Sequence, residues 1–596
     1  MVKTIGGYPR PQMVREGHLM LDGKWGFAFD DADIGERSQW YTKQSSDQEI
    51  LVPFTYETSE SGIADTEYHS IVWYWKKIEL SGWYRPDTHL ILHFEGCDYQ
   101  TKVWVNGRLI GEHSGGYSRF SFDLGEHSET EVLNICVRVS DSLSEEQMRG
   151  KQRWLKDSYG CWYVQTTGIW KSVWAEMVPE SYISNLKMTP DIAGHKLELE
   201  LSVSGIQNRI EAECTVSYQG KRINSIRSMV REGKLEIGID VYDKTVNEWG
   251  IALWAPQHPS LYDLDIKLYV NGELMDHVSS YFGMREIRIK GNNILLNGEP
   301  LYQRLILDQG YWKESGLTPK GDEALLLDIE RVISLGYNGV RKHQKTENER
   351  FLYWCDVKGL LVWEEAPSFY KYSSEAVAGF CTQWLEIVEQ NYNHPSIIVW
   401  TPLNESWGMM EIGRDKKQQS FSQMVYHLTK CVDSMRPVIV NDGWEHTISD
   451  IITLHDYEED GERMFEKYMQ YKDSVLSGEF YHNNYRNAFA EGFSYQGQPV
   501  MISEFGGIAF EQEGTQGWGY GNKVKSADEF IERFQKVTLS VKKLPYVCGY
   551  CYTQLTDVQQ EINGLLTEER KFKVEPEKIR EINEARAGIF FNEKCH

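Results

Sequence analysis

Two short apolar runs in the second half of the chain each end in a glutamate. One run, residues 396–405, reads SIIVWTPLNE, and the other, residues 499–504, reads PVMISE. Short runs that are rich in β-branched residues and apolar on both faces are typical of buried parallel strands in α/β proteins. In a (β/α)8 barrel, such strands present their last residues at one face. We therefore expect Glu405 and Glu504 to lie at the same face of a barrel.

The segment that contains these runs alternates between helix and strand patterns. In residues 322–336, Leu325, Ile329, Val332 and Ile333 recur at helical spacing, and a second helix is predicted over residues 349–358. The short β-branched runs give eight predicted strands, over residues 301–307, 338–341, 360–363, 396–401, 437–440, 451–454, 500–503 and 547–552. Eight β/α units in about 310 residues match the size of a (β/α)8 barrel. The two glutamates then follow the fourth and the seventh strand.

The first 283 residues have a different, β-rich pattern. Short alternating runs separated by turns fill residues 1–180, and Asn106-Gly107 is a hairpin signal between two of them. Residues 181–283 form a second unit, whose size and regular strands are typical of an immunoglobulin-like sandwich. The sequence therefore predicts three domains, over residues 1–180, 181–283 and 284–596, with the barrel last.

Composition and charge exclude several classes of protein. Hydrophobic residues make up 41% of the 596-residue chain and no apolar stretch is long enough to span a membrane. The N-terminus lacks the apolar core of a secretory leader, which favours a cytoplasmic protein. The net charge of −25 argues against a nucleic-acid partner, because phosphate binding needs clustered Lys and Arg. The ten cysteines show no paired metal-ligand spacing, so neither a zinc site nor a redox site is expected.

Two carboxylates at one face of a barrel suit glycoside hydrolysis. Retaining glycosidases hold two carboxyl groups roughly 5–5.5 Å apart; one attacks the anomeric carbon while the other protonates the leaving group. Asn404 precedes Glu405, and its amide is suited to bind the sugar hydroxyl beside the anomeric carbon. We therefore predict Glu405 as the general acid/base and Glu504 as the nucleophile. Acids at strand ends also serve other purposes in barrels, so the spacing alone leaves both interpretations open.

Motifs along the whole chain resemble glycoside hydrolase family 2, the family of β-galactosidases, β-glucuronidases and β-mannosidases. In the N-terminal part they are residues 94–96 (FEG), 103–107 (VWVNG), 115–120 (GGYSRF) and 167–173 (TGIWKSV). In the barrel they are residues 296–300 (LNGEP), Asn404-Glu405 and Ser503-Glu504-Phe505-Gly506. The resemblance implies a jelly-roll sugar-binding domain, an immunoglobulin-like sandwich and a catalytic (β/α)8 barrel. It implies the same roles for the two glutamates.

The resemblance also implies which residues surround the two glutamates. Arg341 stands at the position of an arginine that supports the nucleophile, and Tyr457 at that of a tyrosine that hydrogen-bonds it. Whether His343 or Gln344 faces the sugar stays open, because the chain is one residue shorter than the family pattern there. The candidate substrate-binding residues are Asn404, Asp308, Arg341, His343, His455, Tyr457, Trp444 and Trp518. For each of them the alternative is a residue that only packs in the core, in a loop or at the barrel rim.

Three departures from the family pattern narrow the substrate. Leu565 stands where glucuronidases carry a lysine for the sugar carboxylate, which argues against a uronic acid. Phe369 and Lys371 stand where the large bacterial β-galactosidase has magnesium ligands, so no metal is expected. Thr553 stands in place of the tryptophan that usually lies under the sugar, so a furanose or pentose glycoside remains an alternative substrate.

These observations predict an exo-acting retaining β-glycosidase for a terminal neutral sugar, with a β-galactoside favoured and no cofactor. The alternatives are an enzyme for a galactofuranoside or arabinoside, a β-glucuronidase-like enzyme, a transglycosylase, and a non-catalytic carbohydrate-binding protein on the same fold. The expected partner is a small oligosaccharide or glycoside, and self-association into a homo-oligomer is left open.

Overall fold

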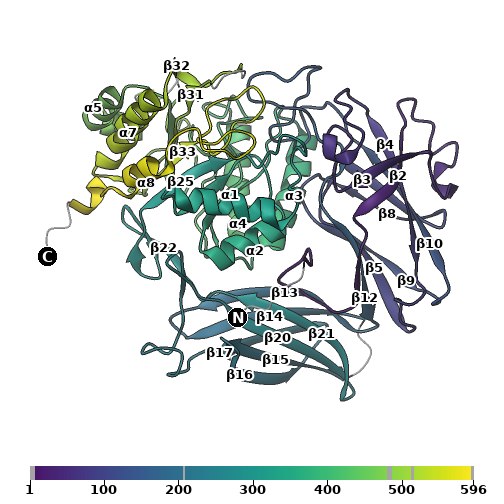
Figure 1. The fold of residues 1–596 in the computed structure, drawn as a ribbon. Coiled ribbons are helices and arrows are strands. Elements are labelled where there is room, and N and C mark those ends of the chain that lie inside the picture. Colours follow the sequence, from purple (N-terminus) through teal and green to yellow (C-terminus); the bar gives the residue numbers. More distant parts are fainter. Residues whose placement is uncertain (1–6, 206–208, 479–485, 512–515, 592–596) are drawn as a thin grey trace.

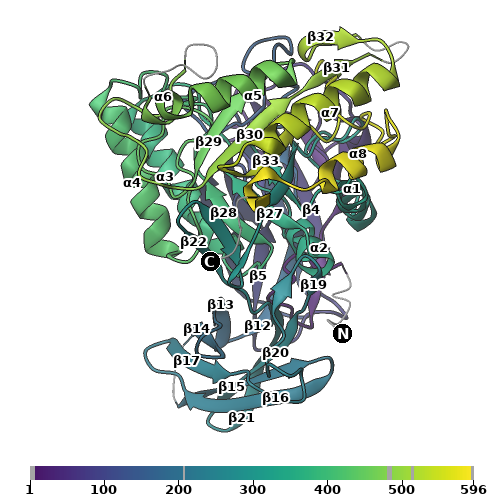
Figure 2. The ribbon, with the colours of Figure 1, turned by 90° about the vertical axis from the view of Figure 1, so that its left-hand side faces the viewer.

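The computed structural model describes residues 7–205, 209–478, 486–511 and 516–591. Figure 1 shows three parts: a β-rich part in purple, a β-sandwich in teal at the bottom, and a barrel in green and yellow. The order of these parts along the chain is the one that the sequence predicts. Figure 2 shows the sandwich projecting below the other two parts.

The N-terminal part is a jelly-roll of two antiparallel sheets. The smaller sheet has the order β1 (His18–Met20), β12 (Val173–Pro179), β5 (Thr88–Phe94), β9 (Phe120–Glu126). The larger sheet has the order β3 (Gln48–Val52), β2 (Gly23–Phe29), β4 (Ile71–Glu79), β10 (Val132–Ser140), β7 (Gln100–Val105), β8 (Arg108–Ser114). Apolar side chains from both sheets form one buried core. The predicted hairpin at Asn106-Gly107 joins β7 to β8, and both residues have the positive φ that such a tight turn requires.

The middle part is a sandwich of two antiparallel sheets with a core of its own. Its sheets are β13 (Tyr182–Asp191), β14 (Lys196–Ser204), β17 (Lys234–Asp240) and β16 (Lys221–Met229), β15 (Ile210–Tyr218), β20 (Tyr262–Val270), β21 (Glu273–Phe282). Inward and outward residues alternate along these strands, as the sequence pattern predicts.

The barrel contains a curved sheet of seven parallel strands. In spatial order they are β28 (Ile397–Thr401), β27 (Leu361–Glu365), β26 (Gly339–Lys342), β25 (Gln303–Asp308), β33 (Val547–Thr553), β30 (Val500–Gly506) and β29 (Ile452–Asp456). Almost every residue of these strands is buried, because helices cover the outside of the barrel and side chains fill its inside.

The prediction of a regular fifth strand over residues 437–440 is wrong. This segment does lie beside β28, where Trp400 donates to the Pro437 carbonyl at 3.1 Å and Ile439 donates to Trp400 at 3.0 Å. On its other side, however, the amide of Val438 donates to the side chain of Asp450 at 2.8 Å instead of to β29. The chain therefore fills the fifth position of the barrel with isolated bridges and not with a continuous ladder.

The helices flank the sheet. They are α1 (Asp322–Ser334), α2 (Glu349–Lys358), α3 (Ser374–Asn391), α4 (Lys416–Val432), α5 (Gly461–Gln470), α6 (Lys472–Ser477), α7 (Ala527–Lys543) and α8 (Pro576–Glu584). Figure 2 shows α5 and α7 side by side over β29 and β30. In α1 the predicted face is buried at Leu325, Ile329 and Val332, but Ile333 is 39% exposed, because it lies at the edge of that face. Helices with the length and apolar character of a membrane span do not occur in the described part of the chain.

Both β-rich parts dock on the barrel through buried polar contacts. In the jelly-roll, Lys171 donates to the Glu347 carbonyl at 3.2 Å, and the Ser118 hydroxyl donates to Glu386 at 2.6 Å. From the end of the sandwich, Arg285 donates to the Pro395 carbonyl at 2.9 Å. These contacts hold the jelly-roll and the sandwich against the barrel.

Candidate active site

The two predicted catalytic glutamates lie together at the carboxyl ends of the barrel strands. Glu504 is within β30, and Glu405 lies four residues beyond β28. Carboxylate oxygens of Glu405 and Glu504 and a ring nitrogen of His455 all lie within 4.8 Å of one another. The side chains of the two glutamates are 14% and 6% exposed, so both carboxylates are largely shielded from water.

Arg341, at the end of β26, is fully buried and holds Glu504 in place. Its Nη1 donates to Glu504 Oε1 at 2.7 Å, and its Nη2 donates to Asn404 Oδ1 at 2.7 Å. Its Nε lies 2.7 Å from Glu365 Oε2 and 2.9 Å from Asp442 Oδ2. A guanidinium suits this position because its fixed, planar set of donors can serve several carboxylates at once.

Tyr457 supports the other oxygen of the same carboxylate. Its hydroxyl donates to Glu504 Oε2 at 2.5 Å and lies 3.2 Å from the hydroxyl of Thr553. The ring of Tyr520 stacks on that of Tyr457, with 3.4 Å between the ring centroids. Both oxygens of Glu504 are therefore positioned by donors that rest on rigid neighbours.

His455 lies between the two glutamates. Its Nδ1 lies 2.7 Å from Glu405 Oε1 and 3.5 Å from Glu504 Oε2, and its Nε2 lies 3.2 Å from Asp442 Oδ2. Burial lowers the pKa of His455, but the charges of Glu504 and Asp442 outweigh it and raise the pKa to about 10. His455 is therefore an imidazolium at neutral pH.

The environment moves the pKa values of the two glutamates in opposite directions. Burial and the nearby charge of Glu504 raise the pKa of Glu405. Burial also opposes ionisation of Glu504, but the positive charges of His455 and Arg341 outweigh it and lower its pKa. Two carboxyl groups whose pKa values are pushed apart in this way suit an acid and a nucleophile that work together.

Asn404 and Glu405 have features that point to a ligand. Among the residues that the structure describes, the buried side-chain Nδ2 of Asn404 has no hydrogen-bond partner, which leaves a donor beside Glu405. Glu405 and Ser406 have φ values of 49° and 56°, in the left-handed region that residues with side chains rarely adopt. Such strain persists where the surrounding structure holds it, often at functional sites. Here the Glu405 amide donates to the Asp442 carbonyl at 2.9 Å.

His343 and Gln344 lie against different groups. Nη2 of Arg341 lies 3.2 Å from His343 Nδ1, and burial lowers the pKa of His343 well below its ordinary value. The Gln344 side chain instead donates to Glu365 at 2.8 Å and accepts from the Ser368 amide at 2.7 Å. These partners favour His343, and its contact with the sugar stays a prediction.

Two predicted substrate-binding residues have other partners. Asp308 accepts from Lys342 at 2.7 Å and from the Gly310 amide, so its carboxylate belongs to a buried ion network. The Trp444 ring lies 4.7 Å below the guanidinium of Arg486. Both oxygens of Asp308 thus have partners within the fold, and its role as a sugar ligand stays a prediction. The contact with Arg486 does not connect Trp444 to either glutamate.

Trp518 contacts a pair of stacked tyrosines, one of which bonds Glu504. Its Nε1 donates to the Gly160 carbonyl of the jelly-roll at 2.9 Å, and its ring meets the edge of Tyr520 at 5.5 Å. Because Tyr520 stacks on Tyr457, two tyrosine rings separate Trp518 from Glu504, the nucleophile candidate. It borders the site without touching either glutamate.

A second polar cluster lies beyond the end of β33. Glu561 accepts from Tyr163 of the jelly-roll and from Gln309 at 2.9 Å. Gln309 also donates to Gln554 at 2.6 Å, and Gln554 donates to Asn563 at 2.6 Å. Leu565, which the sequence comparison places at the lysine of glucuronidases, is fully buried in the barrel core.

The sequence analysis missed several residues of the site. Glu365 ends β27 and Asp442 ends the fifth-strand segment, so the rule that found Glu405 and Glu504 applies to them as well. Lys151 and Trp407 lie in turns, and Tyr520 begins the short strand β32 (Tyr520–Val524); no local sequence pattern marks them.

One group in the described part of the chain brings three potential metal ligands together: Glu405, His455 and Glu504. Its atoms are already joined by the 2.7 Å contact between His455 and Glu405. The predicted absence of the magnesium site rests on Phe369, which is fully buried, and on Lys371, which pairs with Glu146. That absence stays a prediction.

Comparisons with known proteins agree along the whole chain. Models of glycosyl hydrolases family 2 match residues 19–179 (sugar binding domain), 181–285, and 287–585 (TIM barrel domain). A β-galactosidase of Thermoanaerobacter pseudethanolicus is 24% identical over 519 residues, 83% of this chain and 67% of its own length. A β-glucuronidase of Canis lupus familiaris is 24% identical over 637 residues, 96% of this chain and 91% of its own length.

Solved structures share the fold. A β-galacturonidase from Eisenbergiella tayi superposes with a TM-score of 0.76 at 20% identity, covering 99% of this chain and 100% of its own. A Bifidobacterium dentium β-glucuronidase superposes with a TM-score of 0.79 at 17% identity, covering 97% and 99%. At these identities the likeness establishes the fold, while the sugar must be argued from the residues.

Proposed function

Because the chain belongs to glycosyl hydrolase family 2, we propose that this glycoside hydrolase is an exo-acting, retaining β-glycosidase in which Glu504 is the nucleophile and Glu405 the acid/base. The observation that carries the proposal is that one carboxylate oxygen of Glu405 and one of Glu504 lie within 4.8 Å of each other. Inverting enzymes keep the carboxyl groups roughly 6.5–9.5 Å apart to admit a water molecule, whereas retaining enzymes hold them roughly 5–5.5 Å apart.

In the first step Glu504 attacks the anomeric carbon while Glu405 gives its proton to the leaving oxygen. The lowered pKa of Glu504 keeps it ionised for this attack, and the raised pKa of Glu405 keeps a proton available. In the second step Glu405, now ionised, takes a proton from water, which attacks the glycosyl ester and releases Glu504. Nδ2 of Asn404, which has no partner within the described part of the chain, is suited to bind the hydroxyl beside the anomeric carbon.

We assign a neutral sugar to the site, with a β-galactoside favoured. The carboxylate of Glu561 supports this, because it would repel the carboxylate of a uronic acid placed beside it. Thr553, at the end of β33, favours a furanose or pentose glycoside as the second candidate, since no aromatic ring stands at that residue to underlie a pyranose. The relatives include proteins named β-glucuronidase and β-galacturonidase, so uronides belong in the test.

The roles of the two glutamates are tested by Glu504→Gln and Glu405→Gln. We expect Glu504→Gln to abolish turnover of every substrate. Glu405→Gln is expected to slow substrates with poor leaving groups most, and added azide should restore turnover of activated aryl glycosides as a β-glycosyl azide, because azide needs no general base. The exposed Glu511→Gln serves as the control. Equal, unimpaired rates in both active-site variants would refute the assignment.

The sugar is tested with a panel of nitrophenyl glycosides. The panel contains β-galactopyranoside, β-glucoside, β-galactofuranoside, arabinosides, β-glucuronide and β-galacturonide. We expect the highest kcat/KM for a neutral glycoside. Preferred cleavage of a uronide would overturn the neutral-sugar assignment, and sugar binding without turnover on the whole panel would favour a carbohydrate-binding protein.

A further inference from the structure

A loop of the jelly-roll, residues 141–167, reaches over the barrel mouth. The backbone amides of Arg149 and Gly150 donate to the Ser368 carbonyl at 3.0 and 3.1 Å. The Tyr370 hydroxyl donates to the Gly150 carbonyl at 2.6 Å. In each contact the loop contributes a backbone group, so the contacts fix the path of the loop against the barrel.

Gly150 makes this close approach feasible. Its φ is +57°, and a Cβ at this position would lie 2.3 Å from the Gln344 carbonyl oxygen. Only a residue without a side chain fits against the barrel backbone here. The next residue, Lys151, is thereby delivered to the site with its backbone held: its carbonyl accepts from the Tyr163 amide at 2.8 Å.

The side chain of Lys151 is buried among the groups of the candidate active site. It is 6% exposed, and its Nζ lies 4.8 Å from the ring centroid of Trp407, two residues after Glu405. Burial lowers the pKa of Lys151, but Cys161, Glu561 and Glu504 outweigh it and raise the pKa above its ordinary value. Lys151 therefore remains a cation inside the site.

The ammonium group is not used by an ion pair of the fold. Among the residues that the structure describes, no carboxylate oxygen lies within 4.0 Å of Lys151 Nζ. A buried ammonium has three donors to satisfy, and leaving them without acceptors is costly. Lys151 makes a side-chain hydrogen bond to Cys161, whose sulfur is a weak acceptor, and Glu504 and Glu561 stabilise its charge from a distance. The remaining donors of the ammonium group are suited to oxygen acceptors of a ligand.

We propose that Lys151 is a substrate-binding residue that the jelly-roll contributes to the subsite for the cleaved sugar, where it donates hydrogen bonds to sugar hydroxyls between Glu504 and Glu561. This proposal rests on the proposed function. It makes the jelly-roll a direct determinant of sugar specificity, because one sugar then bridges the barrel and the N-terminal part.

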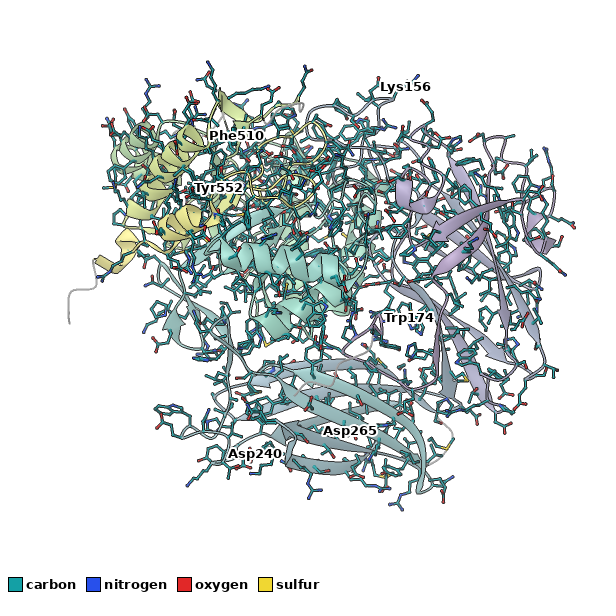
Figure 3. All side chains as sticks on the ribbon, in the orientation of Figure 1. Lys156, Trp174, Asp240, Asp265, Phe510 and Tyr552 are labelled. Atoms are coloured by element: carbon teal, nitrogen blue, oxygen red, sulfur yellow. The ribbon has the colours of Figure 1, made fainter. Side chains whose placement is uncertain are left out.

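The test begins with Lys151→Met, which keeps an unbranched stem against Trp407 and removes the donors. Lys156→Met is the matched control, since Lys156 lies in the same loop with an exposed side chain at the outer edge of the molecule (Figure 3). We expect kcat/KM of the preferred neutral glycoside to fall roughly 10- to 100-fold for Lys151→Met, as for loss of a hydrogen bond from a charged donor. The control should stay at the wild-type value.

Deoxy substrates separate a contact with the sugar from a general disturbance. On the glycoside that lacks the contacted hydroxyl, Lys151→Met should lose little or nothing relative to wild type. An equal loss on every deoxy glycoside, or no loss on the parent, would overturn the proposal. A loss confined to uronides would overturn it as well, because Lys151 would then bind a carboxylate. Lys151→Gln keeps a neutral donor and should recover part of the loss if Lys151→Met folds poorly.

A trapping experiment separates failure of this proposal from failure of the proposed function. A 2-deoxy-2-fluoro glycoside with a good leaving group should label Glu504 in the wild type, as located by mass spectrometry. If Glu504 is labelled but Lys151→Met is unaffected on all substrates, the Lys151 proposal alone fails. If no label forms on Glu504, the proposed mechanism fails and this inference with it.

Discussion

Replacing His455 with asparagine should shift both limbs of the pH profile of kcat/KM to higher pH. His455 is a cation whose Nδ1 lies 2.7 Å from Glu405 Oε1 and 3.5 Å from Glu504 Oε2. Asparagine removes the charge and leaves a shorter, neutral donor. Both glutamates then lose a neighbouring positive charge, so the pKa of each should rise.

The size of the rise follows from the distances. Two unit charges about 4 Å apart interact with about 4 kcal/mol at an effective dielectric constant of about 20, and with about 1 kcal/mol in water. One pKa unit equals about 1.36 kcal/mol, so the first figure corresponds to a pKa rise of about 3. Because both carboxylates are largely shielded but still reach solvent, we expect each pKa to rise by about 1 to 3.

The assay is kcat/KM as a function of pH. The acid limb reports ionisation of Glu504 and the alkaline limb reports the proton on Glu405, so both limbs should move to higher pH. The control is His446→Asn, because burial lowers the pKa of His446 to about 4 and the residue carries no charge at neutral pH. It should leave the limbs in place. A His455→Asn profile that is only lower, with unmoved limbs, would refute the charge argument.

His455 should also make folding stability depend on pH. Its pKa in the folded protein is about 10, above the value of about 6.5 in an unfolded chain. The imidazolium therefore contributes stability that is fully present below pH about 6.5 and is lost as the pH rises through about 10. Denaturant unfolding at pH 6 and pH 10 should show a larger difference for wild type than for His455→Asn.

Three further substitutions test other parts of the site. Tyr457→Phe removes the 2.5 Å hydrogen bond to Glu504 and should lower kcat/KM roughly 10- to 100-fold; an unchanged value would contradict its supporting role. Asp308→Asn removes one of the two carboxylates that pair with the buried Lys342, the other being Glu347, and should lower the free energy of unfolding by about 1–3 kcal/mol with little change in KM. A raised KM at full stability would instead make Asp308 a sugar ligand. Gly150→Ala should lower both the melting temperature and kcat/KM, because the added methyl group meets a barrel carbonyl; loss of neither would count against the fixed loop.

The sequence predicted the parts of the site that depend on chain-local patterns. Glu405, Glu504, Arg341, His455 and Tyr457 all lie in the last part of a strand or shortly after one, and parallel strands bring their carboxyl ends to one face whatever the loops do. Their positions therefore followed from counting strands and from the family resemblance. Their convergence on one site is what the structure adds.

What the sequence did not reveal has physical causes that no local pattern contains. Asp308 also ends a strand, and its pairing with Lys342 from the neighbouring strand becomes visible only in the folded chain, while its role as a sugar ligand stays a prediction. The β-branched residues 437–440 predict a strand, yet side chains from residues 449–450 replace the ladder on one side. Lys151 lies some 250 residues before Glu405, and its approach depends on docking between two parts of the chain.

The shared guanidinium of Arg341 has a consequence for how this enzyme can diverge. One side chain bonds Glu504, Asn404, Glu365 and Asp442, so altering any of these partners changes the balance for the others. The effects of mutations within this group therefore depend on one another. Evolution by single substitutions is expected to retain Arg341 and these four partners. New sugar preferences are then expected to arise in the loops that carry Lys151 and Trp518, where substitutions leave that network intact.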